Sequence, residues 1–251
     1  MRVIAPSFHA PMPLERGLSK TRPLFRGVMG CGTMLVAWIL GGFALTFGVV
    51  FGAHADALQT LNVFLKTTQS AQAAFTQTVT SAQREGQLAK RKVSKGSFEF
   101  IRPHQFRFDY SSPYAQMILA DGQTLWVYDK DIAQVSAKPQ AQAMGNTPAA
   151  LIAFASDISV IQKDFLLENQ APSDGLEWVK GTPKKPDGPL MWVRFGLRMT
   201  EQGVSLERLE MRDAFNQESS LSFVDFKINP KTLQAERFNF KPPAGVEVIR
   251  Q

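Results

Sequence analysis

The stretch GSFEFIRPHQFRFDYSSPYAQMILADGQTLWVY, residues Gly96 to Tyr128, decides the fold, because it holds four short strand patterns separated by turn residues. The strands are predicted at Ser97–Ile101, Gln105–Tyr110, Ala115–Ala120 and Gln123–Tyr128. The breaks between them are Arg102-Pro103, Ser112-Pro113 and Asp121-Gly122, and the last is a strong hairpin signal. The stretch therefore predicts antiparallel strands joined by tight turns.

One face of the second of these strands is wholly aromatic. Phe106, Phe108 and Tyr110 alternate with Arg107 and Asp109, and successive side chains of a strand point to opposite faces. An aromatic strip of this kind either builds an ordinary sheet core or lines a cavity for an apolar ligand. The residues alone leave both interpretations open.

The chain on either side of this stretch adds helices and more strands. A helix is predicted at Ala57–Ala71, where apolar residues form a broad face. Asn146-Thr147-Pro148 is a typical helix start, and the short helix expected at Ala149–Ser156 is apolar on nearly every side. Such a helix either packs in a core or covers a cavity as a lid.

The remaining periodic segments read as strands. They are Phe75–Thr80, Asp131–Ala137, Glu177–Lys180, Met191–Leu197, Val204–Arg212, Ser219–Ile228 and Arg237–Phe240, and Lys138–Gly145 reads as a polar loop. The pattern predicts one large, strongly curved antiparallel sheet with two or three helices against its concave face.

Residues 1–55 have the pattern of a targeting segment. A basic region ends at Arg26, residues 27–52 carry no charge, and Ala53-His54-Ala55 is a small-x-small cleavage signature. We expect a signal peptide cleaved after Ala55 and a single domain over residues 56–251; the alternative is an uncleaved membrane anchor. Cys31, the single cysteine, lies in this leader and only weakly matches a bacterial lipidation box.

The charge balance excludes an electrostatic nucleic-acid binder. The leader holds five of the 28 basic and one of the 22 acidic residues, so the net charge falls from +6 to +2 when it is removed. His104 is the only histidine after residue 55, and no thiol remains there, so neither a metal cluster nor a Cys/His pair can be built. We expect no enzyme, no cofactor and no metal.

Arg102 is the polar residue whose position suggests a role. It ends an apolar strand beside the aromatic strip and offers five donors and no acceptor. If it faces the concave side, its natural partners are free carbonyls at helix C-termini, which carry partial negative charge. The alternative is a solvated arginine in a turn.

Several segments together resemble the periplasmic lipoprotein carrier family LolA. They occur in the family's order through residues 56–251. The segments are Arg102-Pro103 with Phe106 to Tyr110, Leu119 to Tyr128, Gly145 to Pro148 ahead of the apolar helix, and Phe238 to Val248.

The resemblance implies an unclosed β-barrel covered by a helical lid. It further implies a monomeric periplasmic chaperone that takes outer-membrane lipoproteins from an ATP-driven inner-membrane ABC transporter to an outer-membrane receptor. The family's lid-locking arginine corresponds to Arg102, and its cargo-receiving phenylalanine to Phe106. The cargo cavity that the resemblance implies is also lined by Phe108, Leu151, Ile152 and Phe154, and Ala153 lies in the lid.

The chain departs from the family pattern at Phe108, where tryptophan is common, at Tyr114, where some members are acidic, and in its long leader. Two other functions stay open. One is a periplasmic sensor of lipid or lipoprotein, and the other is a tethered lipid-binding protein if the leader is retained. An enzyme acting on lipid ranks last, because the residues for it are missing.

Overall fold

The computed structural model describes residues 56–82, 88–143, 148–185 and 188–250. Within these ranges, none of the helices has the length and apolarity that a bilayer crossing needs. The leader predicted over residues 1–55, its cleavage site and the cap at Asn146-Thr147 lie outside them.

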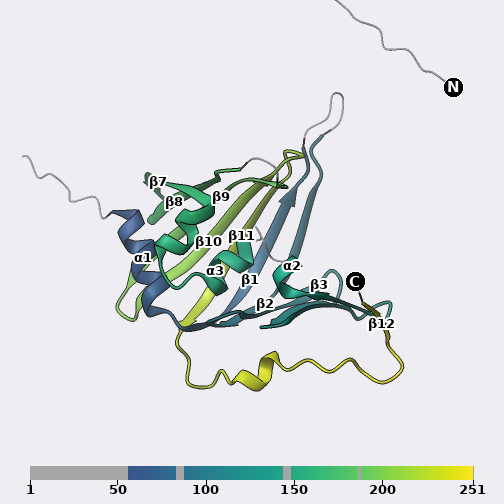
Figure 1. Ribbon diagram of the computed structural model, residues 1–251. Helices are drawn as coiled ribbons and strands as arrows, with labels where there is room; N and C mark the ends of the chain where they lie inside the picture. Colours follow the sequence, from purple (N-terminus) through teal and green to yellow (C-terminus); the bar gives the residue numbers. More distant parts are fainter. Residues whose placement is uncertain (1–55, 83–87, 144–147, 186–187, 251) are drawn as a thin grey trace, which may run out of the picture. The chain divides into compact units, whose positions relative to one another are not determined.

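The described residues form one twelve-stranded sheet, and its two edge strands, β12 and β7, are not paired with each other. The strands are β1 Ser70–Thr80, β2 Arg91–Ile101, β3 Gln105–Ser112, β4 Gln116–Asp121, β5 Thr124–Asp129, β6 Gln134–Pro139, β7 Phe165–Ser173, β8 Leu176–Pro183, β9 Leu190–Thr200, β10 Gly203–Asp213, β11 Glu218–Ile228 and β12 Glu247–Arg250. Their spatial order is β12-β6-β5-β4-β3-β2-β1-β11-β10-β9-β8-β7. The predicted curved, unclosed sheet is therefore confirmed (Figure 1).

Strand β1 joins the two halves of this sheet. It pairs antiparallel with β2 on one edge, where Phe75 lies opposite Gly96, and with β11 on the other, where Phe75 lies opposite Phe223. All neighbouring pairs are antiparallel except β12 with β6, which run parallel. A long-range ladder at the centre of the sheet thus holds the early and late parts of the chain together.

Four helices accompany the sheet: α1 Ala57–Thr67, α2 Gln140–Ala143, α3 Pro148–Phe154 and α4 Ile158–Asp164. The Asp56 side chain caps α1 by accepting from the Leu58 N–H, and Asp157 caps α4 in the same way through Ser159. In Figure 1 the labelled helices α1, α2 and α3 lie on the same side of the sheet, over β2, β3 and β8 to β11. Helix α4 contacts α1 and β7.

The other face of β2 to β6 is covered by the chain that follows β11. This segment contains the 3₁₀ helix η1 Ala235–Phe238 and ends in β12 (Figure 1, yellow). Arg237 forms an ion pair with the buried Glu99 over 3.0 Å, and Phe240 packs on Trp126 with ring centroids 5.4 Å apart. The sheet is consequently buried on both faces in this half.

Several element boundaries differ from the sequence predictions. Helix α1 ends at Thr67 rather than Ala71, because the chain turns extended at Thr68 and enters β1 at Ser70. The strand predicted at Asp131–Ala137 lies at Gln134–Pro139, and the expected loop after it contains α2. The sequence analysis gave no specific prediction for α4, β7 or β12.

The strand prediction at Arg237–Phe240 is wrong, because Arg237 and Phe238 belong to η1, residues 239 and 240 have no regular structure, and the segment crosses the sheet instead of joining it.

Candidate functional site

An aromatic surface covers the concave face of the central strands. Phe98 stacks on Phe108 with centroids 4.4 Å apart, and Phe75 meets Phe108 edge-on at 5.4 Å. Phe223 of β11 lies 5.4 Å from Phe98. The alternation along β3 therefore places its aromatic residues as predicted, on the face that looks toward the helices.

Helix α3 closes over this surface with its apolar residues. Ile152 and Ala153 are buried against the aromatic cluster, and Leu151 and Phe154 are half-buried against it. The Phe154 ring lies 6.4 Å from Phe106. Helix α3 is thus in contact with the aromatic surface through its own apolar side chains.

Arg102 connects the sheet to both helical segments. Its Nη1 donates to the carbonyl of Thr68, the C-terminal cap of α1, and its Nη2 donates to the carbonyl of Ile152 in α3 over 2.6 Å. Both acceptors lie at helix C-termini, where carbonyls lack partners within the helix. Of the two interpretations from the sequence, the structure supports the arginine that faces the helices and excludes the solvated turn residue.

The surroundings of the guanidinium are apolar. It lies 4.9 Å from the Phe100 ring centroid and 5.4 Å from that of Phe64. Burial lowers the pKa of Arg102 from its ordinary value to about 10. The group therefore remains charged at neutral pH, and its charge is balanced by carbonyl dipoles and ring faces rather than by a carboxylate.

All six residues predicted for the site lie together. Phe106, Phe108 and Ile152 are buried in one cluster, Leu151 and Phe154 pack against it, and Arg102 bonds Ile152 at its edge. Two tryptophans lie outside this site. Trp126 belongs to the opposite face, in a cluster with Leu119 and Val135. Trp192 is half-buried beside Arg212 and is not part of the aromatic cluster.

Several members of the aromatic surface were not predicted from the sequence. Phe98 and Phe100 alternate along β2, so the same period-two argument identifies them. Phe64 lies on the apolar face of α1. Phe226 packs on Phe64 because Asp225 has a left-handed backbone that shifts the alternation in β11, and no sequence signal marks that bulge.

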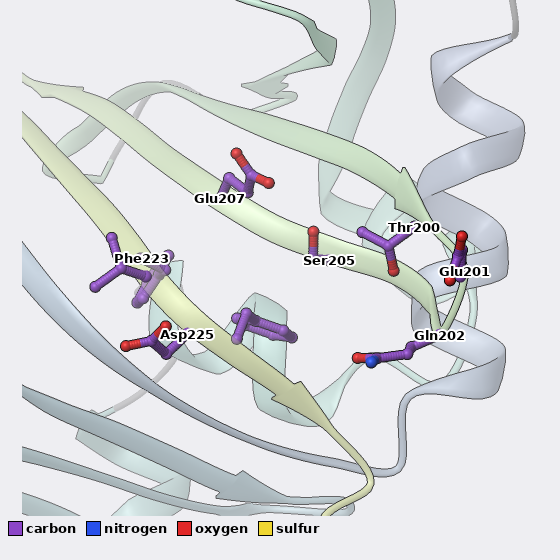
Figure 2. Close-up of a pocket in the computed structure, with 9 residues that line it drawn as sticks. Thr200, Glu201, Gln202, Ser205, Glu207, Phe223 and Asp225 are labelled. Atoms are coloured by element: carbon purple, nitrogen blue, oxygen red, sulfur yellow. The ribbon is translucent and has the colours of Figure 1, made fainter.

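A separate cleft of about 530 Å³ opens where β10 and β11 part. The ladder between these strands runs from Arg208 opposite Ser222 to Arg212 opposite Glu218. Figure 2 shows Ser205 and Glu207 on one side of the cleft and Phe223 and Asp225 on the other. Its lining combines polar side chains with Phe223 and Phe226, which also belong to the aromatic cluster, so the cleft adjoins the aromatic surface at its edge.

Titratable side chains do not gather as a metal centre in the part of the chain that the structure describes. Within it, no three His, Cys, Asp or Glu side chains are grouped as metal ligands. His104 packs its ring against Phe154 with centroids 4.8 Å apart. The aromatic cluster and the apolar residues of α3 hold apolar surface away from water.

Comparison with known proteins adds family information to this geometry. Residues 66–241 match the family model described as outer membrane lipoprotein carrier protein LolA. An outer-membrane lipoprotein carrier protein of Albidiferax ferrireducens is 50% identical over 199 residues, covering 79% of this chain and 93% of the relative. One from Methylibium petroleiphilum is 46% identical over 199 residues, with 79% and 92% covered.

A crystal structure of a LolA superfamily protein from Nitrosomonas europaea aligns with 73% of this chain and 96% of that chain. The TM-score is 0.43 and the sequence identity 14%.

Proposed function

Because this chain belongs to the outer membrane lipoprotein carrier family LolA, we propose that it carries lipoproteins across the periplasm and shields their acyl chains on the aromatic surface beneath α3. It receives them from an ATP-driven ABC transporter of the inner membrane and delivers them to a receptor in the outer membrane. It acts as a carrier and not as an enzyme.

The observation that carries this proposal is the bond from Arg102 to Ile152 across the edge of the aromatic surface. A simple core needs no charged group among its phenylalanines, since burying a charge costs free energy unless it is well paired. A cover that must open benefits from a few directed contacts that are lost together. Arg102 supplies such contacts to α1 and α3 at once.

The size of the cargo's apolar surface explains why the cover must move. Burying an acyl chain is worth about 0.8 kcal/mol per methylene, so one long chain represents on the order of 10 kcal/mol. A rigid, deep pocket of that affinity would not release its cargo. A lid whose own side chains reoccupy the surface offsets part of this free energy and lets the cargo leave.

Each residue of the site then has a role. Phe106 and Phe108 form the floor that contacts acyl chains, and Leu151, Ile152 and Phe154 are the lid side chains that these chains displace. Arg102 sets the balance between closed and open lid, because only contacts that differ between two states can shift their equilibrium.

The working location is the periplasm, reached through the signal peptide expected over residues 1–55, and the carrier works as a monomer.

A release assay tests this function. The full gene is expressed in a Gram-negative host, and the processed protein is purified from the periplasm and added to energised spheroplasts that retain newly made outer-membrane lipoproteins. We expect one-to-one complexes of protein and lipoprotein in the medium. If a folded preparation releases no lipoprotein, the carrier function is rejected.

A further inference from the structure

The concave face does not stay apolar along its whole length. Beyond the aromatic surface, along the same face of the sheet, polar side chains of five adjacent strands line a groove of about 350 Å³. The members of this polar row are Gln77 of β1, Ser94 of β2, Tyr110 of β3, Gln116 of β4 and Asp129 of β5.

The strand register pairs members of the polar row between β1 and β2 and from β3 to β5, whereas Tyr110 lies opposite Gly96, two residues from Ser94. Gln77 lies opposite Ser94, Tyr110 opposite Gln116, and Gln116 opposite Asp129. Each has the same parity as an aromatic or apolar residue further along its strand, so the row and the aromatic surface share one face.

Tyr110 forms the boundary between the two surfaces. Its ring packs on Phe75 with centroids 5.1 Å apart and on Phe108 at 6.3 Å. Its hydroxyl donates to Oε1 of Gln77 over 3.0 Å, and Nε2 of Gln77 donates in turn to the Ser219 hydroxyl over 2.9 Å. The boundary is therefore sharp and held in place, which is the arrangement that an amphiphile with an apolar and a polar end requires.

The groove carries no net formal charge. Lys92 and Asp129 both line it, so their formal charges cancel, and Lys92 also lies 5.2 Å from the ring of Tyr114 at the rim. The other polar groups are amides and hydroxyls, beside the apolar Val79 and Pro113, and they donate to carbonyl oxygens and accept from amide N–H groups. An uncharged ligand rich in ester and peptide groups fits this lining better than a phosphate does.

We propose that the polar row binds the neck of the cargo, namely the glyceryl ester carbonyls and the first peptide groups that follow the lipid-modified cysteine. This rests on the proposed carrier function. With the acyl chains on the aromatic surface, the neck crosses Tyr110 and meets Gln116, Ser94 and Asp129. The row is then the part of the site that distinguishes a lipoprotein from a plain fatty acid.

The test compares two probes on the processed full protein. One is a synthetic tripalmitoyl-S-glycerylcysteine peptide and the other is a fluorescent fatty acid of the same chain length. The variant combines Gln116→Leu with Ser94→Ala, and Gln123→Leu at the exposed β4–β5 turn is the matched control. Loss of two hydrogen bonds predicts roughly tenfold weaker lipopeptide binding with unchanged fatty-acid binding.

The outcomes separate this inference from the carrier function. If the wild type binds the lipopeptide and the double variant binds it equally well, the polar row is not the neck site. Equal losses for both probes also overturn the inference, because the variant then alters the aromatic surface. A wild type that binds neither probe rejects the carrier function itself.

A second variant and a third probe sharpen the result. Tyr110→Phe keeps the ring on Phe75 and removes only the hydroxyl, so we expect a smaller loss that is again confined to the lipopeptide. Phosphatidylglycerol vesicles serve as competitor. If the lipid displaces the lipopeptide from the wild type and loses affinity in parallel in the double variant, the row recognises esters in general and the lipoprotein assignment is wrong.

Discussion

Nη2 of Arg102 donates to the backbone carbonyl of Ile152 over 2.6 Å, and this bond joins the end of β2 to helix α3 fifty residues later. The acceptor is a main-chain atom, so substitution of Ile152 leaves it in place. The donor is a side chain with two amino groups that reach two helices. The hydrogen bond can therefore be removed by substituting Arg102, but not by substituting Ile152.

Replacing Arg102 with leucine should produce a carrier that loads cargo but releases it slowly. Leucine fills space between Phe64 and Phe100 without bonding either carbonyl, so the closed lid loses the contacts that compete with the cargo. We expect transfer to the outer-membrane receptor to slow by on the order of tenfold or more. The measurement is the rate at which purified carrier–lipoprotein complexes pass cargo to receptor-containing vesicles.

Two further variants control for charge and for folding. Arg208→Leu removes an arginine that only approaches Asp174 at 3.9 Å on the surface, and it should transfer normally. Arg102→Lys keeps the charge but not the two-armed geometry, and it should be intermediate. Normal delivery by Arg102→Leu would exclude the lock.

Phe106→Glu should fold but take up no lipoprotein. Phe106 is 2% exposed and lies under Phe154, so a carboxylate there places a charge where acyl chains are to bind. We expect a lower Tm, an intact far-UV spectrum and loss of release from spheroplasts. Phe215→Glu, at a position that is 81% exposed, is the matched control. Uptake at the wild-type rate by Phe106→Glu would refute the assignment of this residue.

The lid contact should be insensitive to pH through the neutral range. The pKa of Arg102 is lowered by burial to about 10, below that of an exposed arginine, so folded and unfolded states both carry the proton below about pH 9. Between the two pKa values the unfolded state binds more protons, so the contribution of Arg102 to stability rises with pH only there.

We accordingly expect the Tm difference between wild type and Arg102→Leu to be constant from about pH 5 to 9. Thermal unfolding followed by circular dichroism measures it. A difference that changes steadily across this range would show that another titrating group controls the contact.

Arg237→Leu should destabilise the fold without changing the aromatic surface. Glu99 is 2% exposed and is bonded by Arg237 and by Gln72, so loss of the arginine leaves a buried carboxylate underpaired. We expect a cost of roughly 1–3 kcal/mol, reduced from a fully buried pair because Arg237 is half exposed. Urea unfolding measures the change in the free energy of unfolding.

The double variant Glu99→Gln with Arg237→Leu is the comparison for Arg237→Leu. It removes the charge that Arg237→Leu leaves behind, so it should recover part of the lost stability. A double variant that is less stable than Arg237→Leu would mean that Glu99 is held by contacts other than this ion pair.

The site was predictable to the extent that it depends on alternation along single strands. Phe106 and Phe108 follow from the period of two in β3, and the partners of Arg102 follow from the free carbonyls of helix ends. The residues whose position depends on tertiary structure were not predicted. Phe226 reaches the aromatic surface only because Asp225 adopts a left-handed backbone, with φ of 54°.

The errors in the fold have similar causes. Helix α1 stops at Thr67 because Ser70 already pairs with Ile101, a contact that local propensity does not register. Arg237–Phe240 alternates like a strand, yet its arginine is drawn to Glu99 across the face of the sheet. A pattern of alternation identifies which side chains share a face, and it does not specify whether a segment joins the sheet or lies on it.

The central position of β1 has a consequence for the newly made chain before it folds. This strand is made early, but one of its edges is covered only by β11, which begins at Glu218. Until synthesis and export have delivered those late residues, β1 presents open main-chain donors and acceptors that can pair with other chains. The nascent protein therefore depends on being kept apart from its copies, as its finished form is proposed to keep lipid-modified proteins apart from water.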